Sequence, residues 1–249
     1  MKALLNKEIK SKAELFRTTS GFGPTDSICL DSFLLKKNIT TLFKPMSGNF
    51  AGMAIKANNE RNFILVNSKH TKGKQHFTIA HELYHLFIQE NFKSQRCETG
   101  LFERQQDIEE RKADIFAACF LMPENGIFEL IPDKEKAGKN LISTETLFRI
   151  QHYFNVSFNA LIYRIIELGY IDKTYYDKYE SGKKTIALRL GYDISLYEPA
   201  NENKVIGDYA SKASYLYKKQ MITEAEYLRL LNTINIDPYK KSIQNKDDE

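Results

Sequence analysis

The chain has 249 residues with a formal net charge of +4, of which 42% are hydrophobic and 27% charged. This composition is that of a globular protein with one large or two smaller domains. No segment approaches the ~18 uninterrupted apolar residues of a membrane span, and the first residues lack the apolar run of a secretory signal, so we expect no membrane partner. The three cysteines are odd in number and widely separated, which is typical of a reducing compartment and predicts a cytoplasmic location.

Two helices are predicted at the start of the chain. The first covers residues 3–17, and its apolar residues at helical spacing predict the buried side. These residues are Leu4, Leu5, Ile9, Ala13, Leu15 and Phe16. Glycine and proline between residues 21 and 26 break this helix, and the second helix is expected to run from an N-cap at Asp26 or Ser27 to Lys37.

Strands are predicted next. Residues 39–43 are rich in β-branched and aromatic side chains, which favours an extended conformation. Residues 50–56 and 62–67 are apolar runs on either side of a turn-like segment at 57–61, and this pattern predicts a β-hairpin. The edge of the hairpin is either a place where an extended peptide substrate adds as a strand or a plain structural element.

The motif His81-Glu82-Leu83-Tyr84-His85 lies in an apolar stretch of helical periodicity. Residues four apart share one face of a helix, so His81 and His85 can bind one metal ion. Zinc accepts imidazole nitrogens and lowers the pKa of a water to about 7. Glu82 lies beside that position and is the candidate catalytic base. The alternative is a buried helix whose two histidines only find hydrogen-bond partners.

A second helix is predicted to complete this site. Residues 89–106 are polar and irregular, which indicates a loop or lid, and a helix is then expected from Ile108 until Pro123 ends it. A catalytic zinc site uses three protein ligands, and Glu110 is the candidate for the third. Asp114 lies on the same helix face and is predicted to accept the free ring N–H of a histidine ligand.

Two alternatives to this assignment stay open. Glu109 is the rival ligand, rotated by about 100° around the helix. Glu110 is favoured because it shares a face with Asp114 and Ala117. The other alternative is that both Glu110 and Asp114 are solvent-facing charges of an amphipathic helix.

The segment around His81 and His85 and the segment from Glu110 to Pro123 together resemble the ImmA/IrrE family of metallopeptidases. The resemblance covers residues 46–172. The matching residues are Phe77-Thr78-Ile79-Ala80-His81-Glu82-Leu83-x-His85, then Glu110-x-x-Ala113-Asp114-x-Phe116-Ala117-Ala118-x-x-Leu121-Met122-Pro123, with Ile64-x-Val66-Asn67-Ser68 upstream and Val156-Ser157, Ala160-Leu161-x-x-Arg164 and Leu168-Gly169 downstream. The chain departs from the family at Tyr84, where glycine is usual. Tyr84 points off the ligand face by helical geometry, so we expect it to change packing rather than chemistry.

The resemblance implies a cytoplasmic zinc peptidase of a bacterium or a mobile element. Members of the family typically cleave a partner repressor that carries a helix-turn-helix, which derepresses stress-response or phage-like genes. By match, His81, His85 and Glu110 would bind zinc and Glu82 would be the catalytic base. Mn²⁺ is expected as a substitute for Zn²⁺.

Residues 141–171 predict two helices, at 144–154 and 158–168, around a turn at 155–157. This spacing matches a helix-turn-helix. Arg164 is the only Lys or Arg of the second helix, and the basic pairs elsewhere are scattered, so helical packing is favoured over DNA binding. Arg164 could instead reach the active site and stabilise an oxyanion or contact the substrate.

The C-terminal region is charged and tyrosine-rich. Helices are predicted at 208–219 and 223–233, the second with Thr223 as its N-cap. The tail from Lys240 is predicted to be disordered. Sequence alone predicts no oligomeric state.

The predicted fold class is α+β. A zincin-like metallopeptidase domain, with a small antiparallel sheet packed on helices, is expected at 1–135, a helix-turn-helix-like region at 136–172 and a mostly helical C-terminal region at 173–249. The main functional hypothesis is a zinc endopeptidase that cleaves a helix-turn-helix repressor. The alternative is a DNA- or repressor-binding regulator with a structural zinc site. A zinc hydrolase of small substrates is a third hypothesis, and no pocket motif supports it.

Overall fold

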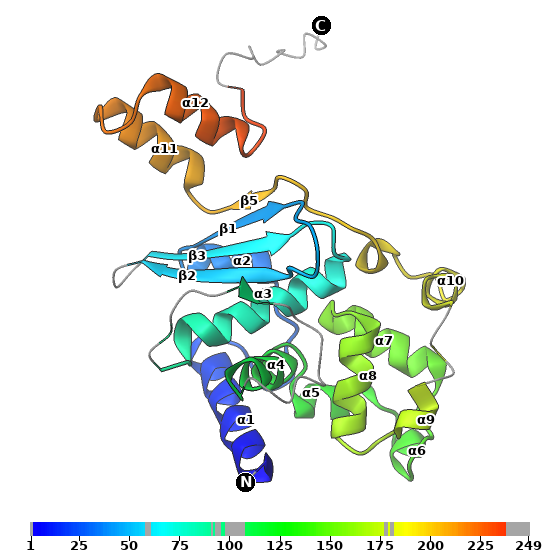
Figure 1. The fold of residues 1–249 in the computed structure, drawn as a ribbon. Helices are drawn as coiled ribbons and strands as arrows, with labels where there is room; N and C mark the ends of the chain where they lie inside the picture. The colour runs from blue at the N-terminus through cyan, green and yellow to red at the C-terminus, as the bar shows by residue number, and fades with distance from the viewer. Residues whose placement is uncertain are drawn as a thin grey trace, which may run out of the picture.

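The computed structural model describes residues 2–57, 61–90, 92, 96–97, 108–176, 179 and 182–237 (Figure 1). The N-terminal half contains α1 (Lys2–Thr19), α2 (Leu30–Lys36), β1 (Ile39–Lys44), β2 (Gly52–Ala57), β3 (Arg61–Asn67), α3 (Lys72–Phe87), β4 (Arg96–Cys97) and α4 (Ile108–Leu121). The remaining elements are α5 (Glu124–Leu130), α6 (Asp133–Lys136), α7 (Thr144–Phe154), α8 (Phe158–Glu167), α9 (Lys173–Tyr176), α10 (Lys183–Arg189), the 3-10 helix η3 (Ser195–Tyr197), β5 (Val205–Ile206), α11 (Tyr209–Lys218) and α12 (Glu224–Asn232).

The strands form one mixed sheet in the order β4-β2-β3-β1-β5. β2 and β3 are the predicted antiparallel hairpin, paired from Gly52 opposite Val66 to Ala57 opposite Arg61. β1 and β3 are parallel, so the prediction of an antiparallel sheet is wrong at this pair. The reason is the loop 45–51, which is long enough to step across the about 10 Å of two strand spacings and leaves a place for β3 between β1 and β2.

Two short strands at the sheet edges are not predicted by the sequence. β4 pairs antiparallel with Gly52 and Met53 of β2. β5 pairs antiparallel with Thr41 and Leu42 of β1, so the C-terminal region contributes a strand as well as helices. Two-residue strands carry too little periodicity to be recognised from sequence, because their extended conformation depends on the neighbouring strand.

The two faces of the sheet pack against different helices (Figure 1). Alternate strand residues point to opposite faces. Ile39, Ile64 and Val66 belong to the main core, on the face of the sheet that α3 covers. Leu42 belongs to a second cluster, together with Phe63 and residues of α11 and α12. The helix that carries the histidines is therefore held between the sheet and α4.

The main core joins the described residues from α1 to β5, whereas α11 and α12 pack in the second cluster. The buried side chains of the main core run from Ile9 in α1 to Ile206 in β5 and include Ala187 of α10. Gln75, at the start of α3, is fully buried and donates to the main-chain oxygen of Ala200 (2.8 Å). The domain limits at 135 and 172 stay predictions.

The start of α2 corrects the sequence prediction. α2 begins at Leu30, with Cys29 rather than Asp26 or Ser27 as its N-cap. Asp26 serves a turn instead, because its Oδ2 accepts the Gly23 N–H (2.7 Å) and its main-chain oxygen accepts from Arg17 Nη2 (2.7 Å).

The buried side of α1 is also narrower than predicted. Ile9 and Ala13 are buried, whereas Leu4 and Leu15 are 74% and 63% exposed. The helix packs along one side against α4, and apolar side chains outside that strip stay in solvent.

α3 begins at Lys72 and includes Gly73. A Cβ on Gly73 would lie 2.7 Å from the main-chain nitrogen of Ser157, so only glycine permits this close approach of α3 to the turn between α7 and α8. Nδ1 of His76 hydrogen-bonds to the main-chain oxygen of Asn155 (2.7 Å) in the same turn. His76 is therefore engaged away from the motif histidines.

The predicted C-terminal helices are present as α11 and α12, and Thr223 caps α12 in a capping box with Glu226. Within the described ranges, no helix has the length and apolar character needed to cross a membrane. The predicted disordered tail from Lys240, and most of the predicted loop or lid at 89–106, lie outside the described residues.

Candidate metal centre

The side chains of His81 and His85 meet on one face of α3. They are one turn apart, their ring centroids are separated by 4.9 Å, and their Nε2 atoms lie 3.1 Å from each other. Both rings are buried, at 1% and 0% exposure. The two histidines therefore share one face of a helix, as their four-residue spacing predicts.

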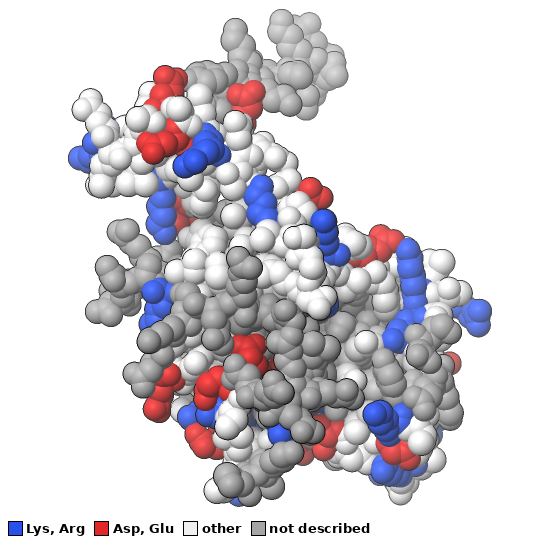
Figure 2. Space-filling view, in the orientation of Figure 1, with Lys and Arg blue, Asp and Glu red and all other residues white. Residues whose placement is uncertain are grey.

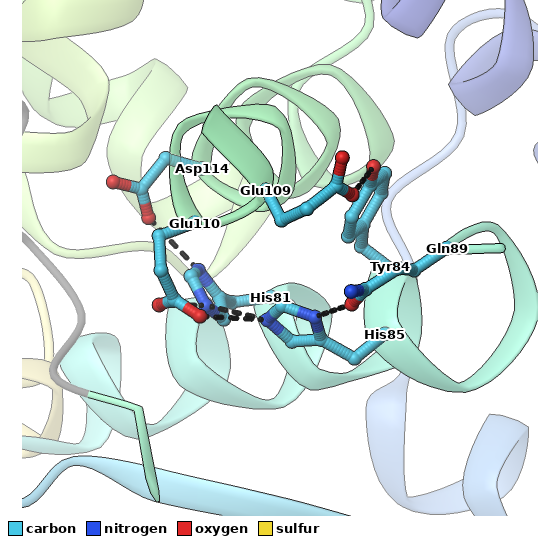
Figure 3. Close-up of polar contacts among 7 residues, drawn as sticks. All are labelled: His81, Tyr84, His85, Gln89, Glu109, Glu110 and Asp114. Atoms are coloured by element: carbon cyan, nitrogen blue, oxygen red, sulfur yellow. Dashed lines mark hydrogen bonds and ion pairs between the residues drawn. The ribbon is translucent and has the colours of Figure 1, made fainter. Parts of the chain in front are cut away.

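The first turn of α4 adds Glu110 to this pair (Figure 3). Its Oε2 lies 3.1 Å from His81 Nε2 and its Oε1 lies 3.4 Å from His85 Nε2. One ligand atom from each of the three residues can be chosen so that all lie within 4.8 Å of one another. Two imidazole nitrogens and a carboxylate oxygen at this spacing form a donor set that fits a divalent metal ion.

The outer nitrogen of each imidazole has its own partner. His81 Nδ1 lies 2.9 Å from Asp114 Oδ1, and His85 Nδ1 lies 2.5 Å from Gln89 Oε1. A carboxylate accepts only, so the Nδ1 of His81 carries the proton and its Nε2 lone pair faces inward. Asp114 therefore lies where the sequence predicts an orienting partner for a histidine ligand.

The electrostatics of the site favour a cation at its centre. Burial by itself would raise the pKa of the Glu110 carboxyl, but hydrogen bonds and charge interactions with His81 and His85 outweigh it and hold the pKa well below its usual range. An ionised carboxylate and two inward-facing Nε2 atoms at these distances need a proton or a metal ion between them.

Glu109, the rival ligand, points away from the histidines. Its Oε2 accepts from the Tyr84 hydroxyl (2.7 Å) and its Oε1 from Lys112 Nζ (2.6 Å) (Figure 3). Tyr84 is 2% exposed and packs on Phe116, with ring centroids 5.8 Å apart. Burial first, and then the hydrogen bond to Glu109, raise the pKa of Tyr84. The structure thus places Glu110, and not Glu109, beside the histidines, and gives Tyr84 the packing role expected of it.

Glu82 is fully buried beside the sheet. An added Cβ on Gly52 of β2 would lie 3.0 Å from Glu82 Oε1, 2.5 Å from Thr78 Cγ2 and 3.1 Å from the main-chain oxygen of Leu65. Glycine at this position lets the strand backbone approach the carboxylate closely.

The sequence interpretation misses two residues, Gly52 and Gln89. Each leaves a weak signal. A glycine inside a predicted strand indicates close backbone approach, and Gln89 lies four residues after His85, which is the helical spacing for a side-chain contact.

Gly52→Ala should therefore lower stability by about 1–3 kcal/mol through overpacking, and displace Glu82. The measurement is urea unfolding together with peptide cleavage. Gly138→Ala is the matched control, because its new Cβ would meet only the flexible Leu141 side chain, at 3.2 Å. Equal stability of the two variants would contradict the tight contact at Gly52.

The edge of β2 next to Glu82 is not open. β4 pairs there, with Cys97 opposite Gly52 and Arg96 opposite Met53. A substrate therefore cannot add as a strand at Gly52 and Met53, because β4 already pairs with them. This corrects the hypothesis of a free hairpin edge at these two residues.

Arg164 does not lie at this site. It is 3% exposed, its Nε donates to the main-chain oxygen of Met122 (3.2 Å), and its Nη1 pairs with Glu167 Oε2 (2.6 Å). Met122 follows α4, about 12 Å along the helix axis from Asp114. The guanidinium joins α8 to the end of α4, which corrects the prediction of an oxyanion or substrate contact.

We expect Arg164→Met to act on stability. The main-chain oxygen of Met122 would lose its buried hydrogen-bond donor, which should lower the free energy of unfolding by about 1–3 kcal/mol. Glu167 would keep its ion pair with Lys10 (2.8 Å). Denaturant unfolding measures this change, and the exposed Arg189→Met is the control that should leave stability unchanged. Loss of peptide cleavage without a change in stability would contradict this prediction and indicate that Arg164 acts in the active site.

A family model described as the IrrE N-terminal-like domain (Peptidase_M78) matches residues 36–165, more than half of the 249 residues. The chain belongs to this family, which confirms the resemblance to the ImmA/IrrE metallopeptidases. A search of curated proteins found no match. The matched range runs from the end of α2 into α8 and contains all the residues of the candidate metal centre. Membership in a peptidase family and a cluster compatible with a metal ion together indicate a metallopeptidase.

Proposed function

We propose that this chain is a zinc-dependent endopeptidase that hydrolyses a peptide bond in a partner protein. The observation that carries the proposal is the convergence of His81, His85 and Glu110, together with a buried Glu82 that directly follows His81 on α3. Glu82 follows the ligand His81 directly but is not one of the three clustered residues. A site in which the metal only stabilises the fold does not need such an additional carboxylate, whereas hydrolysis needs a base. Family membership supports the same conclusion.

The residues divide the chemistry between them. Zn²⁺ held by His81, His85 and Glu110, or Mn²⁺ in its place, would supply a Lewis acid that polarises the scissile carbonyl and acidifies the attacking water. The Glu82 carboxylate would take a proton from that water and deliver it to the leaving amide nitrogen. Asp114 would keep the ring of His81 in the tautomer that leaves Nε2 free to bind.

The partner we propose as substrate is a transcriptional repressor with a helix-turn-helix, whose cleavage derepresses stress-response or mobile-element genes. The support is the family resemblance, and such a substrate would place the reaction in the cytoplasm. The test is to purify a small helix-turn-helix repressor encoded next to this chain and incubate it with the protein and Zn²⁺ or Mn²⁺. Metal-dependent fragments, mapped by mass spectrometry, would support the proposal, and an intact repressor with both metals would contradict this substrate.

The alternative, a DNA- or repressor-binding regulator, has less support. The exposed side chains of α8 include Asn159, Tyr163 and Glu167, and its single basic residue, Arg164, is buried. Lys183 of α10 donates to Asn159 in the first turn of α8 (2.7 Å), at the helix end that would enter a DNA groove. On the face seen in Figure 2, Lys and Arg side chains are interspersed with acidic ones. Salt-sensitive DNA binding would favour this alternative.

A further inference from the structure

The two histidines of the metal centre have different outer partners. His81 is held by Asp114, a carboxylate on the long helix α4. His85 is held by Gln89, a neutral amide that lies just beyond the end of α3 (Figure 3). An amide oxygen is a weaker acceptor than a carboxylate, so the orientation of His85 depends more on how well Gln89 itself is placed.

The main chain around Gln89 is well fixed. α3 ends at Phe87 with Ile88 as its C-cap, and the main-chain oxygen of Tyr84 accepts from the N–H groups of both Ile88 (2.8 Å) and Gln89 (2.9 Å). These two hydrogen bonds to one carbonyl oxygen turn the chain at the end of the helix. The Gln89 side chain is thereby directed back toward His85.

The His85 ring also has an aromatic neighbour. Phe92 stacks on it, with ring centroids 5.5 Å apart and planes inclined by 24°. Phe92 contacts the face of the imidazole and Gln89 contacts its Nδ1, so both the plane and the rotation of the ring are restricted. The stacking alone does not determine which nitrogen carries the proton.

We propose that Gln89 is a positioning residue of the metal centre, which acts through His85. By accepting the Nδ1–H, its Oε1 selects the tautomer whose Nε2 lone pair faces Glu110 and His81. Without this acceptor the ring can carry its proton on Nε2, where it blocks metal binding. The inference rests on the proposed metal centre and adds a residue that the HExxH motif does not include.

The test is metal affinity of the full-length protein, measured by competition of the metal-free form with a chromogenic chelator for Zn²⁺. Gln89→Leu removes the acceptor at similar size, and we expect an affinity about 10- to 100-fold lower, the usual effect of losing the outer partner of a metal ligand. Gln89→Glu supplies a carboxylate acceptor and should bind Zn²⁺ at least as tightly as the wild type. Glu90→Gln, a change at the exposed neighbouring residue, is the matched control and should behave as wild type.

Two further measurements separate positioning from folding. The melting temperature of the metal-free variants reports the fold, and the visible spectrum of the Co²⁺-loaded protein reports ligand geometry, which we expect to change in Gln89→Leu and not in Glu90→Gln. Wild-type affinity in Gln89→Leu, or a loss in Gln89→Glu as large as that in Gln89→Leu, would overturn the proposal. If the wild type itself bound no metal, the proposed metal centre would fail instead, so the two failures are distinguishable.

Discussion

Glu82→Gln should abolish peptide hydrolysis and leave the metal centre loaded. The substitution keeps the size of a side chain that is fully buried beside β2, so packing should be conserved. The amide cannot accept a proton from the attacking water, and loss of a general base costs about 10²- to 10⁴-fold in rate. The measurement is repressor cleavage followed by gel densitometry, with the metal content of the same sample determined by mass spectrometry.

His81→Ala provides the contrast to this variant. It removes a ligand, so both metal and cleavage should be lost, whereas Glu82→Gln should lose cleavage alone. Glu82→Gln protein that retains metal and binds the repressor without cutting it would also be suitable for trapping the complex. Cleavage by purified Glu82→Gln at the wild-type rate would exclude Glu82 as the base.

Glu110→Gln should lose the metal, and Glu109→Gln should keep it. Glu110 contacts both histidines, at 3.1 Å from His81 and 3.4 Å from His85, whereas Glu109 contacts Tyr84 and Lys112. Replacing a direct ligand should weaken Zn²⁺ binding by more than the about 10- to 100-fold typical of outer partners. Chelator competition with Zn²⁺ measures both variants on the same scale.

Glu109→Gln is a matched control because it makes the same chemical change one residue away in the same helix turn. It should weaken the contacts to Tyr84 and Lys112, and therefore lower stability slightly, without removing a ligand. The opposite pattern, with metal lost in Glu109→Gln and kept in Glu110→Gln, would mean that the first turn of α4 presents the other carboxylate.

Local patterns in the sequence predict the parts of this protein that have a clear period. The four-residue spacing of His81 and His85 requires only a helix for the two rings to meet. The same spacing places Glu110 and Asp114 on one face of α4. The two apolar runs that form β2 and β3 around one turn, and the capping residue Thr223, are also local signals, since each predicts interactions between neighbouring stretches of the chain.

Long-range contacts decide the rest. Parallel pairing of β1 with β3, and the short strands β4 and β5, depend on segments that meet only when the sheet forms. The choice between Glu109 and Glu110 depends on how α4 is rotated against α3, and the place of Arg164 depends on a main-chain oxygen, that of Met122, which has no sequence signature.

The sequence by itself thus determined the residue types of the metal centre and the two helices that carry them. The tertiary structure alone decided which face of α4 meets the histidines, that Gly52 approaches Glu82, and that Gln89 holds His85. The physical reason is that periodicity encodes the faces of single elements, whereas the distance between faces depends on packing across the whole core.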